Sequence, residues 1–345
     1  MTDLDEAFER FQAGDFEYAG GLSNHGPMAA EALVHLGHAS LIRGFVDGYA
    51  PRLGPAPARG SPIPATERNA ALGRPGRLAD WLATYETELN EAPWSEVLQR
   101  SLPTLIDGLF AGGTHGLLRT AHAVRALEET ETAQRRRELA HGLAYWAGRY
   151  QALPGNPGSE AREGWGPRRV LAEVRPVPPE SRRQGFFTEG VLALDDDPNF
   201  APLVASAEVS SSEWELLLSE LCHDAAALYL ENPQARVAYV HAVTAPSSLR
   251  LLGPYLDADQ KRRSLGRALQ VAAALHAIAS GPRREDVDDE VRRVAEDPAE
   301  IRYRAACSLE EHAIKLSEAC LREDREAPDP VFRLAAADAA LKLGA

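Results

Sequence analysis

The chain has 345 residues, of which 44% are hydrophobic and 26% are charged. This composition is typical of a globular protein that is long enough to bury a sizeable core. Its formal net charge of −14 disfavours broad electrostatic attraction to nucleic acid or to an anionic membrane. We find no run of about 18 apolar residues that would predict a membrane span, so neither nucleic acid nor a membrane is an expected partner.

The cysteines and the first residues indicate the compartment. The sequence has three cysteines, Cys222, Cys307 and Cys320, and no two of them form a CxxC motif. Their odd number and their spacing disfavour a thiolate zinc site and suit a reducing environment. The segment Met1–Phe16 is acidic and lacks an apolar centre, unlike a secretory signal. We therefore expect a cytoplasmic protein.

In the first half of the chain, apolar residues at helical spacing predict one helix after another. Ser23 or Asn24 is the expected cap of a helix over 28–36, with Pro27 in its first turn. Further helices are predicted over 39–49, 78–89, 94–110, 115–129 and 132–150, with a loop over 51–76. Pro103 is expected to kink or break the helix over 94–110. The Gly-Gly-Thr sequence at 112–114 is expected to turn the chain into the helix that begins at His115.

Residues 153–200 are rich in proline and glycine and interrupt the helical pattern. We interpret them as a long ordered excursion that could serve as a lid, and as the one candidate domain boundary, with a solvated linker as the alternative. Helices are predicted to resume over 212–231, 233–243, 257–280, 286–296, 298–322 and 328–343. The expected fold is all-α and multi-helical, either a single globular domain over 1–345 or two closely packed helical halves.

Two histidine motifs lie in the first half. His25 directly precedes a helix start, and Gly26 permits a close backbone approach there; the alternative is a histidine that only caps a turn. His115, Arg119 and His122 stand at i, i+4 and i+7 on one face of an apolar helix. Buried polar side chains need partners, so a metal ion, an anionic substrate or a polar network in the core is expected beside them.

Two further motifs lie in the second half. His241 stands in a very apolar run, where a neutral histidine bonded to a carbonyl is the alternative to a metal ligand. His312 and Lys315 stand at i and i+3 on one helical face. A buried lysine favours its neutral amine, which can react with carbon dioxide to give a carbamate, an anionic oxygen ligand. The alternative is a surface lysine paired with Glu311 or Glu318.

The adjacent pair His223-Asp224 is of a kind that all-helical phosphohydrolases use, so a divalent-metal phosphohydrolase remains an alternative. A non-enzymatic scaffold of stacked helices is another. The sequence contains no GxGxxG unit after a strand, no Walker loop, no GxSxG and no HExxH. A dinucleotide-binding domain is therefore not expected.

Four short segments, in this order, resemble the questin oxidase-like family: LSNHGPM (22–28), THGL (114–117), VHAVT (240–244) and EHAIKL (311–316). They span nearly the whole chain. Arg119 and Met28 stand at positions where the fungal members tend to carry histidine, so the chain resembles a bacterial-type branch.

The resemblance implies an α-helical oxygenase that acts with dioxygen on aromatic polyketide-type substrates, the best-known activity being oxidative ring opening of an anthraquinone. It also implies a non-haem Fe(II) centre held by His25, His115, His241, His312 and a carbamylated Lys315. The sequence does not indicate whether NADPH or another reductant takes part, nor the oligomeric state.

The mechanistic hypothesis adds three residues beside the metal. Arg119, one turn after His115, is expected to hold the enolate or phenolate of the substrate. His122 and His223 are expected to be partners of the metal ligands or proton carriers.

Overall fold

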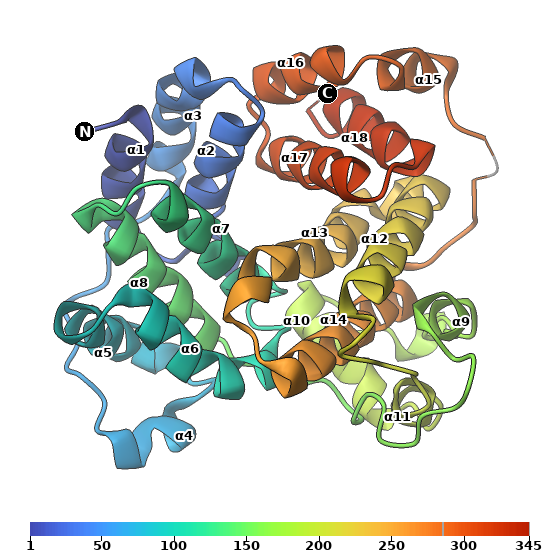
Figure 1. The fold of residues 1–345 in the computed structure, drawn as a ribbon, viewed down its shortest axis with the longest axis horizontal. Coiled ribbons are helices and arrows are strands. Elements are labelled where there is room, and N and C mark those ends of the chain that lie inside the picture. The colour runs from blue at the N-terminus through green and yellow to red at the C-terminus, as the bar shows by residue number, and fades with distance from the viewer. Residues whose placement is uncertain (285, 345) are drawn as a thin grey trace. The chain divides into compact units, whose positions relative to one another are not determined.

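The chain is all-α, as its helical periodicity predicted (Figure 1). A computed structural model describes residues 1–284 and 286–344. These residues divide into two compact units. Unit 1 contains Met1–Ala152 and Leu251–Leu256, and unit 2 contains Leu153–Arg250 and the described residues from Asp257 onward. Unit 2 thus begins where the sequence predicted a boundary segment.

Unit 1 carries the helices of the first half of the chain and a short antiparallel hairpin. Its elements are α1 (Asp3–Gln12), β1 (Glu17–Tyr18), β2 (Leu22–Ser23), α2 (Gly26–His35), η1 (Ala39–Leu41), α3 (Ile42–Tyr49), η2 (Ala50–Arg52), η3 (Ala65–Glu67), α4 (Arg68–Ala71), η4 (Pro75–Arg77), α5 (Leu78–Glu91), α6 (Trp94–Leu105), η5 (Ile106–Gly108), α7 (His115–Glu129), α8 (Ala133–Gly148) and η9 (Gly253–Tyr255). The sequence did not predict α1 or the hairpin, in which Glu17 pairs with Ser23.

Helix α7 begins at His115 and ends at Glu129, as predicted. The preceding Gly112, Gly113 and Thr114 all have positive φ angles, of 57°, 65° and 79°. Such angles favour glycine and turn the chain sharply. Helix α7 packs closely on α8, because a Cβ atom added at Gly116 would lie 2.5 Å from the Cα atom of Trp146.

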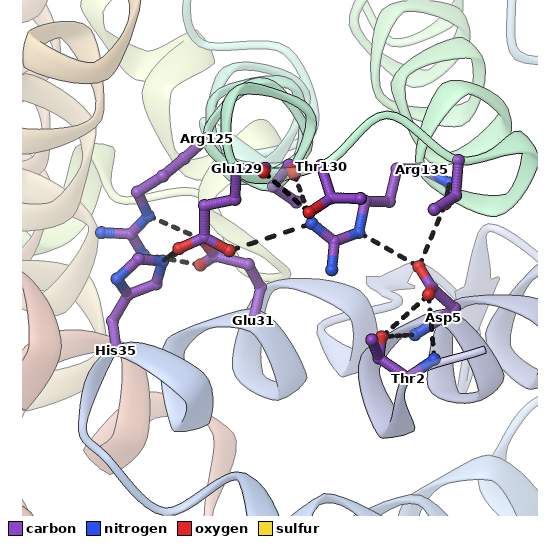
Figure 2. Close-up of polar contacts among 10 residues, drawn as sticks. Thr2, Asp5, Glu31, His35, Arg125, Glu129, Thr130 and Arg135 are labelled. Carbon is purple, nitrogen blue, oxygen red and sulfur yellow. Dashed lines mark hydrogen bonds and ion pairs between the residues drawn. The ribbon is translucent and has the colours of Figure 1, made fainter.

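Two buried carboxylates pair with arginines of α7 and α8 inside unit 1 (Figure 2). Glu31 of α2 accepts hydrogen bonds from Arg125, with Nε 2.6 Å from Oε1. Asp5 of α1 accepts one from Arg135 over 3.0 Å and also completes a capping box with Thr2. These ion pairs join α1 and α2 to the α7–α8 pair.

Unit 2 carries the later helices. Its elements are α9 (Pro167–Ala172), η6 (Pro179–Ser181), α10 (Phe187–Gly190), η7 (Val191–Asp196), α11 (Phe200–Ala205), α12 (Trp214–Glu231), η8 (Pro233–Ala235), α13 (Arg236–Leu252, of which residues up to Arg250 belong to this unit), α14 (Ala258–Ala279), α15 (Asp289–Ala295), α16 (Pro298–Ser308), α17 (Glu311–Glu326) and α18 (Pro330–Lys342). Segment 153–200 is ordered into short helices, with Val170 and Leu194 buried.

The predicted helix boundaries differ most from the observed ones at three places. The single helix predicted over 298–322 is two helices, because Leu309 adopts a left-handed φ of 51° and Glu310 then caps α17. This break places His312 in the first turn of α17. The helix predicted over 233–243 continues to Leu252, although Pro246 removes one backbone donor. The helix predicted over 94–110 ends at Leu105, two residues after Pro103.

Within the described residues, no helix combines the length and the apolar character that crossing a bilayer requires.

Candidate metal-binding residues

The rings of His25 and His115 meet inside unit 1. His25 lies directly before α2, and its Nδ1 is 2.5 Å from the carbonyl oxygen of Ser23. His115 begins α7, and its Nδ1 is 2.6 Å from the carbonyl oxygen of Gly112. A carbonyl oxygen only accepts, so each Nδ1 carries the proton and donates it. In the neutral rings, both Nε2 atoms therefore carry a lone pair.

These two Nε2 atoms lie 2.8 Å apart, with the rings inclined at 76°. Two facing lone pairs repel each other unless a proton or a cation lies between them. Two metal–nitrogen bonds of roughly 2.1 Å at a right angle place their nitrogen atoms about 3 Å apart. The spacing of the pair therefore fits neighbouring ligands of one metal ion.

The local sequence explains the position of His25. The side-chain oxygen of Asn24 accepts a hydrogen bond from the backbone N–H of Gly26 over 3.0 Å. The N-cap residue of α2 is nevertheless His25, without a side-chain cap, so the predicted cap at Ser23 or Asn24 was wrong. The backbone N–H of His25 donates to the hydroxyl of Tyr49 over 2.8 Å. A Cβ atom at Gly26 would lie 2.5 Å from the ring of Phe11, so only glycine fits beside this histidine.

His122 is buried and bound to the carboxylate of Glu31, which lies 2.6 Å from its Nδ1. His35 and Arg125 contact the same carboxylate (Figure 2). Burial alone would raise the pKa of Glu31, but the charges of Arg125 and His122 outweigh it and hold the pKa well below its usual value. Glu31 is therefore ionised and can only accept, which fixes the proton of His122 on Nδ1.

Arg119 is buried and paired with Glu138 of α8. Its Nε lies 2.5 Å from one carboxylate oxygen and its terminal nitrogen 3.1 Å from the other. The guanidinium also lies over the ring of Phe16. The polar stripe predicted on α7 thus has two separate protein partners, Glu138 for Arg119 and Glu31 for His122. A substrate anion would have to compete with the carboxylate of Glu138 for the guanidinium of Arg119. The role of Arg119 in substrate binding therefore stays a prediction.

In unit 2, the rings of His241 and His312 are perpendicular, with centroids 5.8 Å apart. The ring centroid of Phe187 of α10 also lies 5.8 Å from that of His241. The Nδ1 of His312 lies 2.9 Å from a carboxylate oxygen of Glu310. Burial opposes ionisation of Glu310, but hydrogen bonds from His312 and from the backbone of Ala313 hold the pKa of its carboxyl below its usual value. His312 therefore also donates from Nδ1 and keeps its lone pair on Nε2.

Lys315 is 1% exposed, so the alternative of a surface lysine is wrong. Its Nζ has no hydrogen-bond partner among the described residues. Burial lowers the pKa of the amine to about 8, against the opposing charges of Glu311 and Glu310. The ligand atoms of Glu310, Glu311 and His312 all lie within 4.8 Å of one another, so this turn of α17 gathers several potential metal ligands.

His223 has a different environment in unit 2. Its side chain is 31% exposed, and its Nδ1 lies 2.9 Å from Asp224. Asp224 also accepts from Arg168 over 3.2 Å, and the His223 ring packs edge-on against Phe332. The other ring nitrogen, Nε2, lies 3.7 Å from Asp329. His223 thus lies between two aspartates in a partly exposed position, and the phosphohydrolase alternative stays a prediction.

The sequence reasoning gave no role to Glu31 or Glu310, which orient two of the predicted histidines. Glu31 is the only acidic residue between Met28 and Val34. A single carboxylate in an apolar helix could have predicted a buried ion pair. Glu310 gave no such signal, because the helix start that it caps was itself not predicted.

No family model matches the chain, and no curated protein matches it. We therefore infer the function from the geometry of these side chains and from the four segments of the resemblance.

Proposed function

We propose that the chain is a metal-dependent oxidoreductase of the non-haem iron type, and that His25 and His115 bind the ion through their Nε2 atoms. One observation carries the proposal: backbone carbonyls orient the two rings so that two lone pairs face each other over 2.8 Å. A cation relieves this repulsion, and imidazole nitrogen is a suitable ligand for iron.

The other proposed ligands come from the resemblance, which assigns His241, His312 and a carbamylated Lys315 to the same ion. Two features of unit 2 support them. Glu310 fixes the lone pair of His312 on Nε2, and the amine of Lys315 is buried without a hydrogen-bond partner. The proposal also needs an anionic oxygen ligand to stabilise the ferric state.

The proposed substrate is an electron-rich aromatic compound of the polyketide type, such as an anthraquinone, and the proposed reaction is its oxidation by dioxygen. Ring opening that inserts one oxygen atom beside a carbonyl leaves the second atom of dioxygen to become water. That reduction consumes two electrons and two protons, so an assay needs an added two-electron reductant such as NADPH.

His122 is the proposed proton carrier. With Nδ1 held as a donor by Glu31, its basic nitrogen is Nε2, and the neighbouring carboxylate stabilises the protonated ring. Arg119 was predicted to hold the substrate, and His223 was predicted to be a partner of the metal ligands or a proton carrier. Both contribute less to the proposal, because Glu138 and Asp224 already bind them.

Iron content tests the proposal. Protein reconstituted anaerobically with Fe(II) and freed of excess metal should retain one ion per chain, and His115→Ala and His241→Ala should each lose it. His223→Ala is the matched control and should retain the ion, because His223 lies in a helix-surface ion pair. The proposal fails if the wild-type protein retains no iron, or if the His115 and His241 variants retain as much as the control.

A further inference from the structure

Two backbone carbonyls of unit 1 orient the proposed metal-binding pair. The Nδ1 of His25 donates to the carbonyl oxygen of Ser23, and the Nδ1 of His115 donates to that of Gly112. Both carbonyls lie outside helices: Ser23 ends the short strand β2, and Gly112 lies in the turn before α7, with a φ of 57°. The spacing of the two imidazoles therefore depends on the side chains that hold these two segments.

Tyr145 of α8 contacts both segments. Its hydroxyl lies 2.6 Å from the hydroxyl of Ser23. A Cβ atom added at Gly112 would lie 2.7 Å from the Cε1 atom of the Tyr145 ring, so the ring lies directly against this glycine. The hydroxyl of Ser23 also lies 3.4 Å from the carbonyl oxygen of Gly112. Tyr145 is 2% exposed, so these contacts are inside the unit.

The hydroxyl of Tyr145 also joins the hairpin to α8. Glu17 pairs with Arg149, the residue that ends α8, and a carboxylate only accepts hydrogen bonds. Tyr145 therefore donates its single proton to Glu17 over 2.7 Å and accepts from Ser23. Glu17 and Ser23 are direct partners across the β1–β2 hairpin. The phenol thus binds both side chains of one cross-strand pair.

We propose that Tyr145 is a positioning residue of the proposed metal centre. It holds the carbonyls of Ser23 and Gly112 at a fixed separation, and these carbonyls hold the two imidazoles with their Nε2 atoms 2.8 Å apart. In the metal-free chain the two lone pairs repel each other, so the rings keep this spacing only while their supports are held. The inference rests on the proposed function and adds to it a residue outside the coordination shell.

Nitrogen NMR of the metal-free protein, with ¹⁵N-labelled histidine, tests the positioning without any metal. Tyr145→Phe removes the hydroxyl and keeps the ring, so the ring resonances of His25 and His115 should both shift. Tyr49→Phe is the matched control. The hydroxyl of Tyr49 accepts from the backbone N–H of His25 over 2.8 Å, so its loss should shift the resonances of His25 and leave those of His115 unchanged.

Anaerobic titration with Fe(II) measures the consequence for the metal centre. Tyr145→Phe should weaken Fe(II) binding by about tenfold, the lower end of the loss when an outer partner of a ligand is removed. Ser23→Ala keeps the carbonyl and removes the hydroxyl, so it should weaken binding in the same way. Both substitutions break one hydrogen bond, and the double variant should therefore bind no more weakly than the weaker single variant.

Circular dichroism checks that each variant keeps its helices, and Ser23→Ala provides the same test should Tyr145→Phe fail to fold. A shift confined to His25, or Fe(II) affinity equal to that of the wild type, would overturn the inference alone. A wild-type protein that binds no Fe(II) would overturn the proposed function, whatever the metal-free resonances show, so the two failures are distinguishable.

Discussion

Glu31→Gln should strongly destabilise unit 1. The wild-type side chain is fully buried, and its carboxylate contacts Arg125, His122 and His35. Glutamine has nearly the same shape but no charge, so the buried guanidinium of Arg125 would lose its counter-ion. Breaking a buried ion pair in this way costs about 3–5 kcal/mol. Glu129→Gln is the matched control: Glu129 also contacts His35 but is 42% exposed, so its loss should cost less than about 1 kcal/mol.

The effect should depend on pH in a defined direction. The pKa of Glu31 is held well below its usual value by Arg125 and His122, against the effect of burial. A carboxyl with a lowered pKa in the folded state stabilises that state above its unfolded pKa of about 4.3, and this contribution is lost as the pH falls toward the folded-state pKa. The difference between wild type and Glu31→Gln should therefore be full at pH 7 and shrink in acid.

Urea unfolding followed by circular dichroism measures this difference. With a slope of about 3 kcal/mol per molar urea, the midpoint should fall by on the order of 1–2 M at pH 7. A loss no larger than that of Glu129→Gln, or a loss that grows on acidification, would refute the account of Glu31 as a buried counter-ion.

Two further predictions concern packing and the thiols. Gly116→Ala should destabilise the protein by about 1–3 kcal/mol, because the new Cβ atom would overlap the backbone of α8. Gly44 faces open space, so Gly44→Ala should stabilise α3 by about 0.5–1 kcal/mol. Thermal unfolding of the two variants measures these changes, and equal changes in both variants would contradict the prediction. Cys307 is exposed, whereas Cys222 and Cys320 are buried, and burial raises the pKa of both thiols. A thiol reagent should therefore modify one cysteine of the folded protein and all three after unfolding. Rapid modification of all three cysteines in the folded protein would contradict the burial of Cys222 and Cys320.

The helices could be predicted wherever a local signal marks them. The two glycines before His115 predicted both the start of α7 and the turn that orients the imidazole of His115, because positive φ angles favour glycine. The start of α17 could not be predicted in the same way. Leu309 adopts its left-handed conformation without being glycine or asparagine, so the pattern around it indicates one continuous helix.

The sequence indicated which residues to consider for the candidate site, but it did not indicate which side chains contact each other. Apolar neighbours indicated that the helix of Lys315 is at least partly buried, but they left a surface lysine open, and Lys315 is 1% exposed. The partners of α7 were not predictable, because Glu31 contacts His122 across 91 residues of sequence, and no local pattern encodes such a contact. The same holds for Arg119, whose predicted partner was a substrate anion and whose partner in unit 1 is Glu138.

X-ray absorption at the iron edge of the reconstituted protein tests the central claim most directly. If His25 and His115 bind the ion through Nε2, the spectrum should contain the multiple-scattering features of imidazole ligands, and His115→Ala should reduce them. A coordination shell of oxygen atoms alone, or an imidazole signal that His115→Ala leaves unchanged, would contradict the claim that this pair is a metal-binding site.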